Sequence, residues 1–482
     1  MAYTHAERLS ALDQSFLALE EGRSHMHIGG VAIFEAGPLK TASGGIDIDR
    51  IMRLMEAGLY RIPRYRQRLA WTPGFKHPVW IDDPLFNLAY HVRHTHLPRP
   101  GDERLLKRLA GRLMSQELDR GKPLWEMWVV EGLEGDRFAI VTKAHHCMID
   151  GVGSVELTGS VMRPTPDEDP RLAEPPPRWI PRPAPSPREL WLREAWHRTT
   201  APLALARLVR DAVSAPRAAF TTATGTAAGL VDAVAASFRP SSPTPFNVEI
   251  GPYRRFDWTA MDLGRIREVK GRLGGTVNDI VLAIFSGALR RFFHRRGLAV
   301  DGLDFRAMLP VNVRAGDQSM GNRVAMMAVR LPLDAADPRE RLARVVAETT
   351  RVKQSHQAAG IQALEELSDR TFTSIVTEFA RMAVRSQPYN VVVTNVPGPQ
   401  FPVYVLGARM LACYPVVPLF QNQALGLALF SYDGRLYWGF NSDWDVVPDL
   451  HDLVAAVEHE RDAFGNASDE PVVAVASRGR RT

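Results

Sequence analysis

The sequence predicts an α/β (α+β layered) fold of two domains joined by a long crossover, and three observations support this prediction. First, 482 residues exceed what one hydrophobic core normally holds. Second, strand-like and helix-like patterns of apolar residues mix in both halves of the chain. Third, ten prolines within residues 163–188 interrupt regular structure and mark a linker. We therefore assign residues 1–162 to an N-terminal domain, 163–245 to the linker and crossover, and 246–482 to a C-terminal domain.

In the N-terminal domain, short apolar runs predict strands and one amphipathic segment predicts a helix. The strands are expected at Val31–Phe34, Trp128–Val130 and Phe138–Val141, and the helix at Asp102–Leu118. A further helix is expected over Val152–Met162. The last of the three strands runs directly into two adjacent histidines, so the chemistry of this domain is expected at a strand end.

The crossover combines the proline-rich stretch with a segment that resembles an amphipathic helix. Residues 189–220 carry Trp191 and Trp196 among several leucines and arginines, and residues 221–245 are rich in Ala, Thr and Gly. This segment is a candidate for contact with a lipid surface. A helix packed on its own protein remains the alternative.

The C-terminal domain contains the clearest helical periodicity, with apolar residues from Val277 to Phe292 before Arg295-Arg296-Gly297. Asp433-Gly434 between two apolar runs predicts a hairpin. Other elements are expected as strands at Phe305–Leu309, Val324–Leu331, Asn390–Thr394, Leu425–Tyr432 and Leu436–Phe440, two helical stretches between Pro338 and Val384, and a rigid turn at Asn395–Pro399.

Composition argues against several classes of protein. The pI is about 9.3, but the net charge is only +5, seven of the 59 basic residues are Lys, and no basic block carries interleaved aromatics. We therefore expect no nucleic-acid partner. Two cysteines far apart favour a reducing cytoplasm, and no segment has the pattern of a secretory signal or a transmembrane helix. We expect a cytoplasmic protein that would meet lipid only peripherally, on the inner membrane or on lipid inclusions.

The segment His145-His146-Cys147-Met148-Ile149-Asp150-Gly151 carries the chemistry that we expect. Neighbouring side chains of a strand point to opposite faces, so only one of the two histidines can face a given cleft. Asp150-Gly151 indicates a turn. An imidazole placed at a strand end suits proton transfer from an alcohol, because its pKa lies near neutral pH.

Three alternatives compete with a catalytic histidine. The pair could be structural, although its Asp-Gly neighbour makes this less economical. A metal site would need His145, His146 and Asp150 to converge, and no further ligand cluster completes such a set. A nucleophilic Cys147 is conceivable, but nothing nearby marks it as a thiolate, so we expect it to be a small packing residue.

His-His-x-x-x-Asp-Gly is the active-site motif of the chloramphenicol acetyltransferase-like superfamily, which includes condensation domains of peptide synthetases. Further motifs follow in order along the chain, so that the whole sequence resembles the bacterial wax ester synthase/diacylglycerol acyltransferase family. These motifs are Leu9–Asp13, Met26–Gly30, Pro123-Leu124-Trp125, Asn278–Ala283, Pro310–Arg314 and Asn395–Pro399. The resemblance implies two acetyltransferase-like domains that form a V around a central tunnel. The crossover matches no motif of the family.

The resemblance also implies roles for individual residues. His146 would be the general base, His145 its support, and Gly151 the residue that lets the turn and the acyl chain approach closely. Asp150 would be an architectural ion-pair partner, for which we propose Arg314, unless Asp150 caps the following helix and Arg314 meets only solvent or the CoA phosphate.

Other motif residues have both a functional and a structural interpretation. Asn278 would face His146 and hydrogen-bond a reacting oxygen, with Asp279 beside it at the substrate, or both would simply cap a helix. Pro123, Leu124 and Trp125 would help shape the acyl-binding side, or would form a packed strand entry.

The implied function is an acyl-CoA-dependent O-acyltransferase. It would make wax esters from long-chain alcohols or triacylglycerols from diacylglycerol, by direct attack without an acyl-enzyme. Acyl-CoA would be a co-substrate, and neither a cofactor nor a metal ion is expected. Two alternatives remain: a condensation-type enzyme that takes acyl groups from a carrier protein, and a non-catalytic lipid-binding protein of the same fold.

Overall fold

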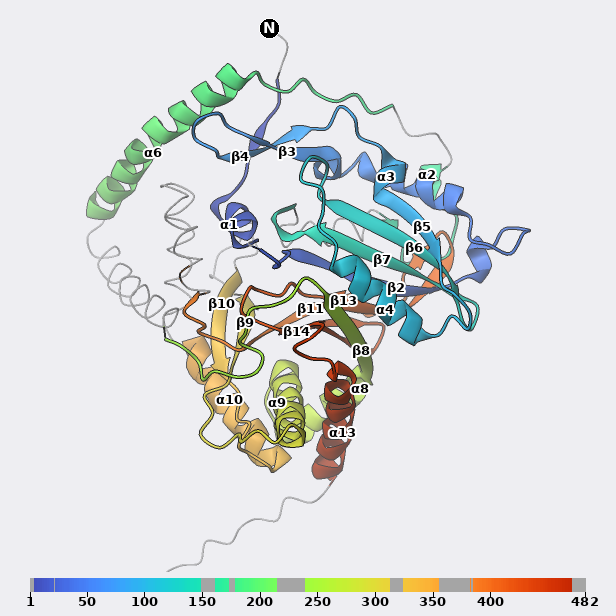
Figure 1. Ribbon diagram of the computed structural model, residues 1–482, viewed down its shortest axis with the longest axis vertical. Coiled ribbons are helices and arrows are strands. Elements are labelled where there is room, and N and C mark those ends of the chain that lie inside the picture. Colours follow the sequence, from blue (N-terminus) through green and yellow to red (C-terminus); the bar gives the residue numbers. More distant parts are fainter. Residues whose placement is uncertain are drawn as a thin grey trace, which may run out of the picture.

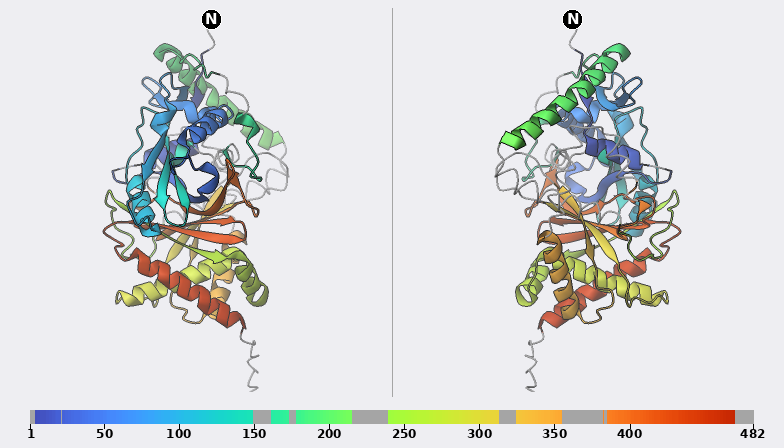
Figure 2. Two further views of the ribbon diagram at one scale, coloured as in Figure 1. Left: turned by 90° about the vertical axis from the view of Figure 1, so that its right-hand side faces the viewer. Right: turned by 90° about the vertical axis from the view of Figure 1, so that its left-hand side faces the viewer.

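Two six-stranded sheets form the centre of the molecule, and a three-stranded sheet lies beside the first (Figure 1). The computed structural model describes residues 4–20, 22–148, 161–172, 178–214, 239–312, 324–354, 382 and 385–469. Helices cover the outer face of the second sheet, so that sheet and helices form layers (Figure 2). This layered mixture of strands and helices in two halves confirms the predicted fold class.

The first half is built on the sheet β12-β13-β2-β7-β6-β5. Ser10 and Asp102 cap two of its helices by accepting backbone N–H groups three residues on, as residues of this type do at helix starts. The strands and the amphipathic helix expected between residues 31 and 141 are all present. The elements are β1 (Glu7–Arg8), α1 (Ala11–Leu19), β2 (His27–Glu35), α2 (Ile48–Leu59), β3 (Gln67–Trp71), β4 (Pro78–Asp82), α3 (Leu88–His91), β5 (Val92–His96), α4 (Glu103–Met114), β6 (Trp125–Leu133) and β7 (Arg137–His145).

Two glycines let three strands of this sheet approach closely. A Cβ atom on Gly29 would lie 1.9 Å from the Thr142 carbonyl oxygen, and one on Gly30 would lie 2.9 Å from that of Tyr414. Side chains at these positions would push β2 away from both of its neighbours. The glycines therefore allow the close pairing of β2 with β7, in which His27 lies opposite His145.

The second half is built on the sheet β10-β9-β11-β14-β15-β8, in which β11 runs parallel to β9 and β14. Thr276 and Asp279 form a capping box at the start of α9, and Asp433-Gly434 turns β14 into β15 with positive φ at both residues. The elements are β8 (Arg254–Asp262), α8 (Leu263–Leu273), α9 (Val277–Arg295), β9 (Arg306–Asn312), β10 (Val324–Arg330), α10 (Pro338–Gln354), β11 (Val391–Pro397), β14 (Leu425–Tyr432), β15 (Arg435–Asp443) and α13 (Leu450–Asp469).

The C-terminal part of the chain contributes two strands to the first sheet. β12 (Tyr404–Val405) and β13 (Ala408–Val416) come from the C-terminal part of the chain, yet β13 pairs antiparallel with β2 of the first sheet. A division of the chain at residue 246 does not anticipate this contribution. The first sheet is therefore completed by sequence from the other side of the crossover, whereas all described strands of the second sheet follow residue 246.

A second contact between the halves joins α4 to β8. The backbone N–H of Arg254 donates to Ser115 Oγ at 2.8 Å, and a Cβ on Gly111 would lie 2.8 Å from the Arg254 carbonyl oxygen. Trp258 Nε1 donates to Glu103 at 3.1 Å, and Lys107 pairs with Asp257. These polar contacts fix how the two sheets meet.

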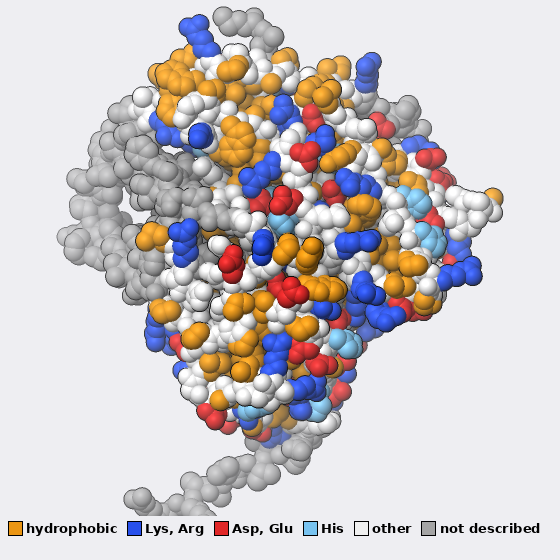
Figure 3. Space-filling view, viewed as in Figure 1, with side chains coloured by type: hydrophobic (Ala, Val, Ile, Leu, Met, Phe, Trp, Pro, Cys, Tyr) orange, Lys and Arg blue, Asp and Glu red, His pale blue; other side chains and the backbone are white. Residues whose placement is uncertain are grey.

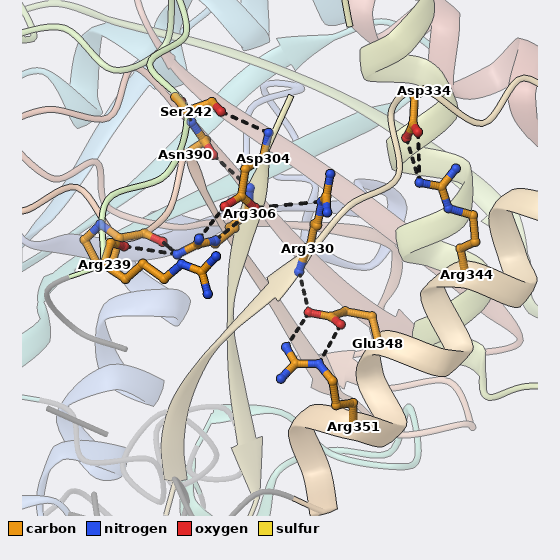
Figure 4. Close-up of polar contacts among 11 residues, drawn as sticks. Arg239, Ser242, Asp304, Arg306, Arg330, Asp334, Arg344, Glu348, Arg351 and Asn390 are labelled. Carbon is orange, nitrogen blue, oxygen red and sulfur yellow. Dashed lines mark hydrogen bonds and ion pairs between the residues drawn. The ribbon is translucent and has the colours of Figure 1, made fainter. Parts of the chain in front are cut away.

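An ion-pair chain ties the start of the second half to its outer edge (Figure 4). Arg306 on β9 pairs with Asp304 and donates to the Arg239 carbonyl oxygen at 3.0 Å, where the chain enters this half. Arg330 on β10 lies 3.8 Å from Asp304, and its N–H donates to Glu348 of α10 at 3.4 Å. The edge strand is thereby connected to the helix that covers it.

The predicted crossover helix is present, whereas the turn predicted at Asn395 is partly wrong. α6 (Pro187–Ser214) confirms the helix predicted after the proline-rich stretch. The turn predicted at Asn395–Pro399 is wrong for its first three residues, because they continue β11 and pair with β14. Most of the helix predicted at Val152–Met162, and the second helical stretch predicted before Val384, lie outside the described residues.

Candidate active site

His146 lies where β7 ends and a 3-10 turn, η3 (His146–Met148), begins. Its backbone N–H donates to the Met26 carbonyl oxygen at 2.8 Å, and its ring stacks on Phe16 with centroids 3.8 Å apart. Nδ1 has no hydrogen-bond partner in the part of the chain that the structure describes. Burial lowers the pKa of His146 to about 4, so the imidazole is neutral at pH 7.

His145 ends β7, makes separate contacts and is almost fully buried. The N–H of Cys147 donates to its Nδ1 at 3.1 Å, and its Nε2 lies 3.1 Å from Glu20 Oε2. Since Nδ1 accepts, the proton of the neutral ring is on Nε2 and is donated to the carboxylate. The two histidines thus have different partners, and only His145 belongs to the strand.

Glu20 connects His145 to a cation. Its carboxylate also accepts from Arg120 at 2.5 Å, and His25 Nδ1 lies 3.9 Å away. Burial by itself would raise the pKa of Glu20, but the hydrogen bonds from His145 and Arg120 outweigh it and lower the pKa to about 2. The group is therefore an anion at any physiological pH.

His27 lies directly opposite His145 on β2. The rings of His27 and His145 are 6.4 Å apart edge to face, and His25 stacks on His27 at 5.3 Å. Burial lowers the pKa of His27 well below its usual value, and neither ring nitrogen has a partner among the described residues. His27 is therefore a neutral packing surface behind His145. No three His, Cys, Asp or Glu side chains in the described ranges are arranged as ligands of one metal ion.

Cys147 lies next to the predicted base, but its environment disfavours the reactive thiolate. Its side chain is buried, and burial raises the pKa of the thiol well above its usual value. A thiol held in this way has little thiolate at neutral pH. This geometry supports the expectation that Cys147 is a packing residue.

The segment Pro123-Leu124-Trp125 supports the site through its backbone. The Leu124 carbonyl oxygen accepts from the N–H of His145 at 2.9 Å. Trp125 begins β6, its indole N–H donates to Tyr65 at 2.8 Å, and its ring stacks on His91. A packed strand entry accounts for these contacts; a role at the acyl chain stays a prediction.

Asn278 and Asp279 lie together at the start of α9 but differ in environment. Asn278 is exposed, and its Oδ1 accepts from Asn395 Nδ2 at 2.6 Å. Asp279 is buried and accepts from Thr276 and from Thr349 Oγ1, at 2.8 Å in each case. Asp279 is thus held as a helix cap, whereas Asn278 offers its amide hydrogens.

A cavity of about 140 Å³ opens beside these residues. Its walls are mostly apolar side chains of α9, α10 and the second sheet, with a few polar groups at its margin. The lining residues are Asn278, Asp279, Val281, Leu282, Leu309, Pro310, Val329, Thr349, Val352, Lys353, Val393, Asn395 and Leu429. Space of this kind on the second sheet is suited to an apolar ligand.

Asp150, Gly151 and Arg314 lie outside the described residues, so the predicted ion pair and the close approach at Gly151 stay predictions. Phe16 and Glu20 were not expected from the sequence, and Asn395 was expected only as part of a rigid turn. Phe16 and Glu20 are four residues apart and follow the capping Ser10, which places them on one face of a helix end. That spacing was the available signal. No helix among the described residues is long and apolar enough to cross a membrane.

Comparison with known proteins gives consistent results. The family model of the wax ester synthase/diacylglycerol acyltransferase catalytic domain matches residues 9–281, and that of the WS/DGAT C-terminal domain matches residues 320–463. Two Mycobacterium tuberculosis proteins provisionally named as diacylglycerol O-acyltransferases are similar. One (strain CDC 1551 / Oshkosh) is 32% identical over 461 residues, 92% of this chain and 87% of that protein. The other (strain ATCC 25618 / H37Rv) is 31% identical over 463 residues, which is 93% of this chain and 94% of that protein.

Solved structures share the fold. The wax ester synthase/diacylglycerol acyltransferase from Marinobacter aquaeolei VT8 has a TM-score of 0.66 at 25% identity and covers 96% of this chain and 99% of that one. A starter condensation domain of rhizomide synthetase has a TM-score of 0.54 at 14% identity over 96% and 95% of the two chains. The second likeness concerns the fold alone.

Proposed function

This chain belongs to the wax ester synthase/diacylglycerol acyltransferase family, and from that premise we propose that it is an acyl-CoA-dependent O-acyltransferase with His146 as general base. Its acceptors would be long-chain alcohols, diacylglycerol or both. The observation that carries the proposal is the state of His146. Its imidazole is neutral at pH 7, its residue is half-buried at the end of β7 with Nδ1 buried, and its ring lies against Phe16.

The proposed reaction needs one base and no covalent intermediate on the protein. His146 takes the proton of the acceptor hydroxyl as its oxygen attacks the thioester carbonyl carbon. The carbon–sulfur bond then breaks, and the departing CoA sulfur takes the proton from the imidazolium. The inert environment of Cys147 supports direct attack, because the nearest thiol is buried with a raised pKa.

Asn278 would stabilise charge on a reacting oxygen. Its Oδ1 is engaged by Asn395, so its Nδ2 hydrogens can point to a developing oxyanion. Asp279 would contribute less directly, since both of its carboxylate oxygens already accept hydrogen bonds. Its substrate role would be to hold the start of α9, and with it Asn278, in place.

The ion pair of Asp150 with Arg314 remains part of the proposal. It predicts that truncation of either residue costs stability and activity together, and that the two losses are far from additive in the double variant. Additive losses would indicate that the two side chains do not interact.

Peripheral contact with a lipid surface is supported by exposed aromatics at one end of the molecule. Trp191 and Trp196 on α6, together with Trp71 at the end of β3, are 45%, 73% and 47% exposed, with Arg193 and Arg198 on the same helix. Hydrophobic side chains gather at this end of the space-filling view (Figure 3). Both arginines are paired with glutamates of α6, so the exposed aromatic side chains are what suits a bilayer surface here. Co-sedimentation with anionic vesicles should weaken in Trp196→Ala, and equal binding by both proteins would contradict this contact.

The activity test uses purified protein with palmitoyl-CoA and either hexadecanol or dioleoylglycerol, with CoA release followed by a thiol reagent. His146→Ala should reduce kcat by about 100-fold or more, since general-base catalysis has that magnitude. His459→Ala, an exposed histidine on α13, is the matched control and should behave as wild type.

Each other outcome is informative. A folded His146→Ala protein with near-normal turnover would contradict the role of His146. If turnover occurred only when the acyl group was supplied on a carrier protein, acyl-CoA would not be the donor. Lipid binding without turnover would indicate a non-catalytic protein.

A further inference from the structure

We propose that Glu20 is a positioning residue for the reaction, which acts on His146 through His145 and through the helix α1. The inference rests on the proposed function, since it explains how that base is held. Glu20 itself would touch neither substrate.

The first step is the contact of Glu20 with His145. Glu20 Oε2 lies 3.1 Å from His145 Nε2, while His145 Nδ1 accepts from the N–H of Cys147 at 3.1 Å. A neutral imidazole can satisfy both contacts only as the Nε2–H tautomer. The carboxylate selects this tautomer, because it needs a donor from Nε2 and thereby leaves Nδ1 free to accept.

The hydrogen bond from the Cys147 N–H to His145 also restrains the backbone of His146. This N–H belongs to the peptide bond that follows His146, so its bond to His145 fixes that peptide plane. The N–H on the other side of His146 is fixed by the Met26 carbonyl oxygen at 2.8 Å. Both peptide groups that flank His146 are therefore held, and the direction of its Cα–Cβ bond follows from them.

Glu20 also helps to position the ring of His146, through Phe16 on the same helix. Phe16, which stacks on that ring, and Glu20 are one helical turn apart, and the N–H of Glu20 donates to the Phe16 carbonyl oxygen at 3.2 Å. Residues at this spacing share one face of a helix end. Docking of Glu20 onto His145 therefore also sets the height of Phe16 over His146.

Arg120 explains how the carboxylate is kept in place. It donates to the same oxygen, Oε2, from the segment between α4 and β6, and the Glu20 side chain is only 12% exposed. A carboxylate held by two donors has little freedom to rotate away. One anchor outside α1 and one on β7 therefore hold the end of α1 against the strand that carries the base.

The test compares two substitutions that separate hydrogen bonding from charge. Glu20→Met keeps similar volume but removes the acceptor, and Glu20→Gln keeps an oxygen for His145 Nε2–H without the charge. We expect Glu20→Met to lower kcat by about tenfold or more, with KM for palmitoyl-CoA changed less than about threefold. Glu20→Gln should recover kcat to within about fivefold of wild type. Glu117→Gln is the control, because this exposed carboxylate acts on His25 only through its charge.

The second measurement is the tautomer of His145, from ¹⁵N NMR of protein labelled at histidine. Wild type and Glu20→Gln should both carry the proton on Nε2, and this decides the matter even if Glu20→Met does not fold. A proton on Nδ1 of His145 in the wild type would overturn the proposal. So would near-normal kcat in folded Glu20→Met, an equal loss in Glu20→Gln, or a loss confined to KM. Failure of the proposed function is distinct from these outcomes: in that case wild type would show no turnover, or His146→Ala would keep it.

Discussion

The surroundings of His146 and those of Asn278 differ in how firmly they are held. On the first sheet, His146 is held at both flanking peptide groups and along its ring, and the side chains behind it are buried. At the start of α9, Asn278 is exposed and bonded to Asn395, next to a cavity with mostly apolar walls. We call the surroundings of His146 the first or dense wall, and those of Asn278 the second or open wall.

This difference matches the demands of the proposed reaction. Proton transfer requires a base within hydrogen-bond reach of the acceptor hydroxyl, held to within about 0.5 Å of the productive geometry, so the groups around it need redundant contacts. A lipid substrate with a long apolar chain requires space and adaptable surroundings. The contrast predicts that changes in the two walls have different consequences.

The largest expected effect is a dependence of stability on pH that comes from the first wall. Burial lowers the folded pKa of His146 to about 4, so below its unfolded value near 6.5 the unfolded chain binds the extra proton. Stability should therefore fall as the pH drops from about 6.5 to about 4, by roughly 3 kcal/mol from His146 alone. Urea unfolding of wild type and His146→Gln at pH 7 and pH 4 measures this.

The comparison with the second wall makes that measurement specific. Asn278→Ala should leave the pH dependence as in wild type, because no titrating group is removed. Parallel losses in wild type and His146→Gln would show that other histidines, such as His77, whose pKa burial lowers to about 4, account for the effect.

A smaller effect is expected from the open wall. Asn278→Ala should lower kcat by about tenfold, less than the loss for a buried oxyanion donor, because water can replace an exposed amide. Steady-state kinetics with both acceptors would show it. An unchanged kcat with intact folding would indicate that Asn278 only begins the helix.

Loss of one contact in the dense wall should cost less again. Phe16→Leu keeps an apolar side chain against His146 but removes ring stacking, worth about 1 kcal/mol, so kcat should fall about fivefold. Phe401→Leu, at an exposed position, is the control. A loss as large as that of His146→Ala would mean that the other contacts do not hold the ring.

The smallest effect is expected at Cys147. Cys147→Ala should keep activity within about twofold, since the thiol is buried and protonated. Intact-mass analysis after mixing with acyl-CoA should show no covalent adduct. An acyl group on Cys147, absent from the variant, would require a ping-pong mechanism instead.

Local sequence patterns predicted those elements in which apolar residues follow a single helical or strand spacing, or in which turn residues are distinctive. The amphipathic helix now seen as α4, the helix α9 and the hairpin at Asp433-Gly434 follow from spacing and turn chemistry alone. The turn at Asn395 was predicted wrongly, because Pro397 suggested an interruption. β11 continues through it, since the proline carbonyl can still accept although its nitrogen cannot donate.

The sequence by itself determined the layered α/β class, the histidine pair at a strand end, and the family to which the chain belongs. Only the tertiary structure decided what holds His146, because Glu20 and His145 are 125 positions apart and no period connects them. It also decided that β13 completes the first sheet and that Asp279 caps α9. Periodicity reports which face of an element is buried, whereas the partner across that face is set by packing and by the pairing of buried polar groups.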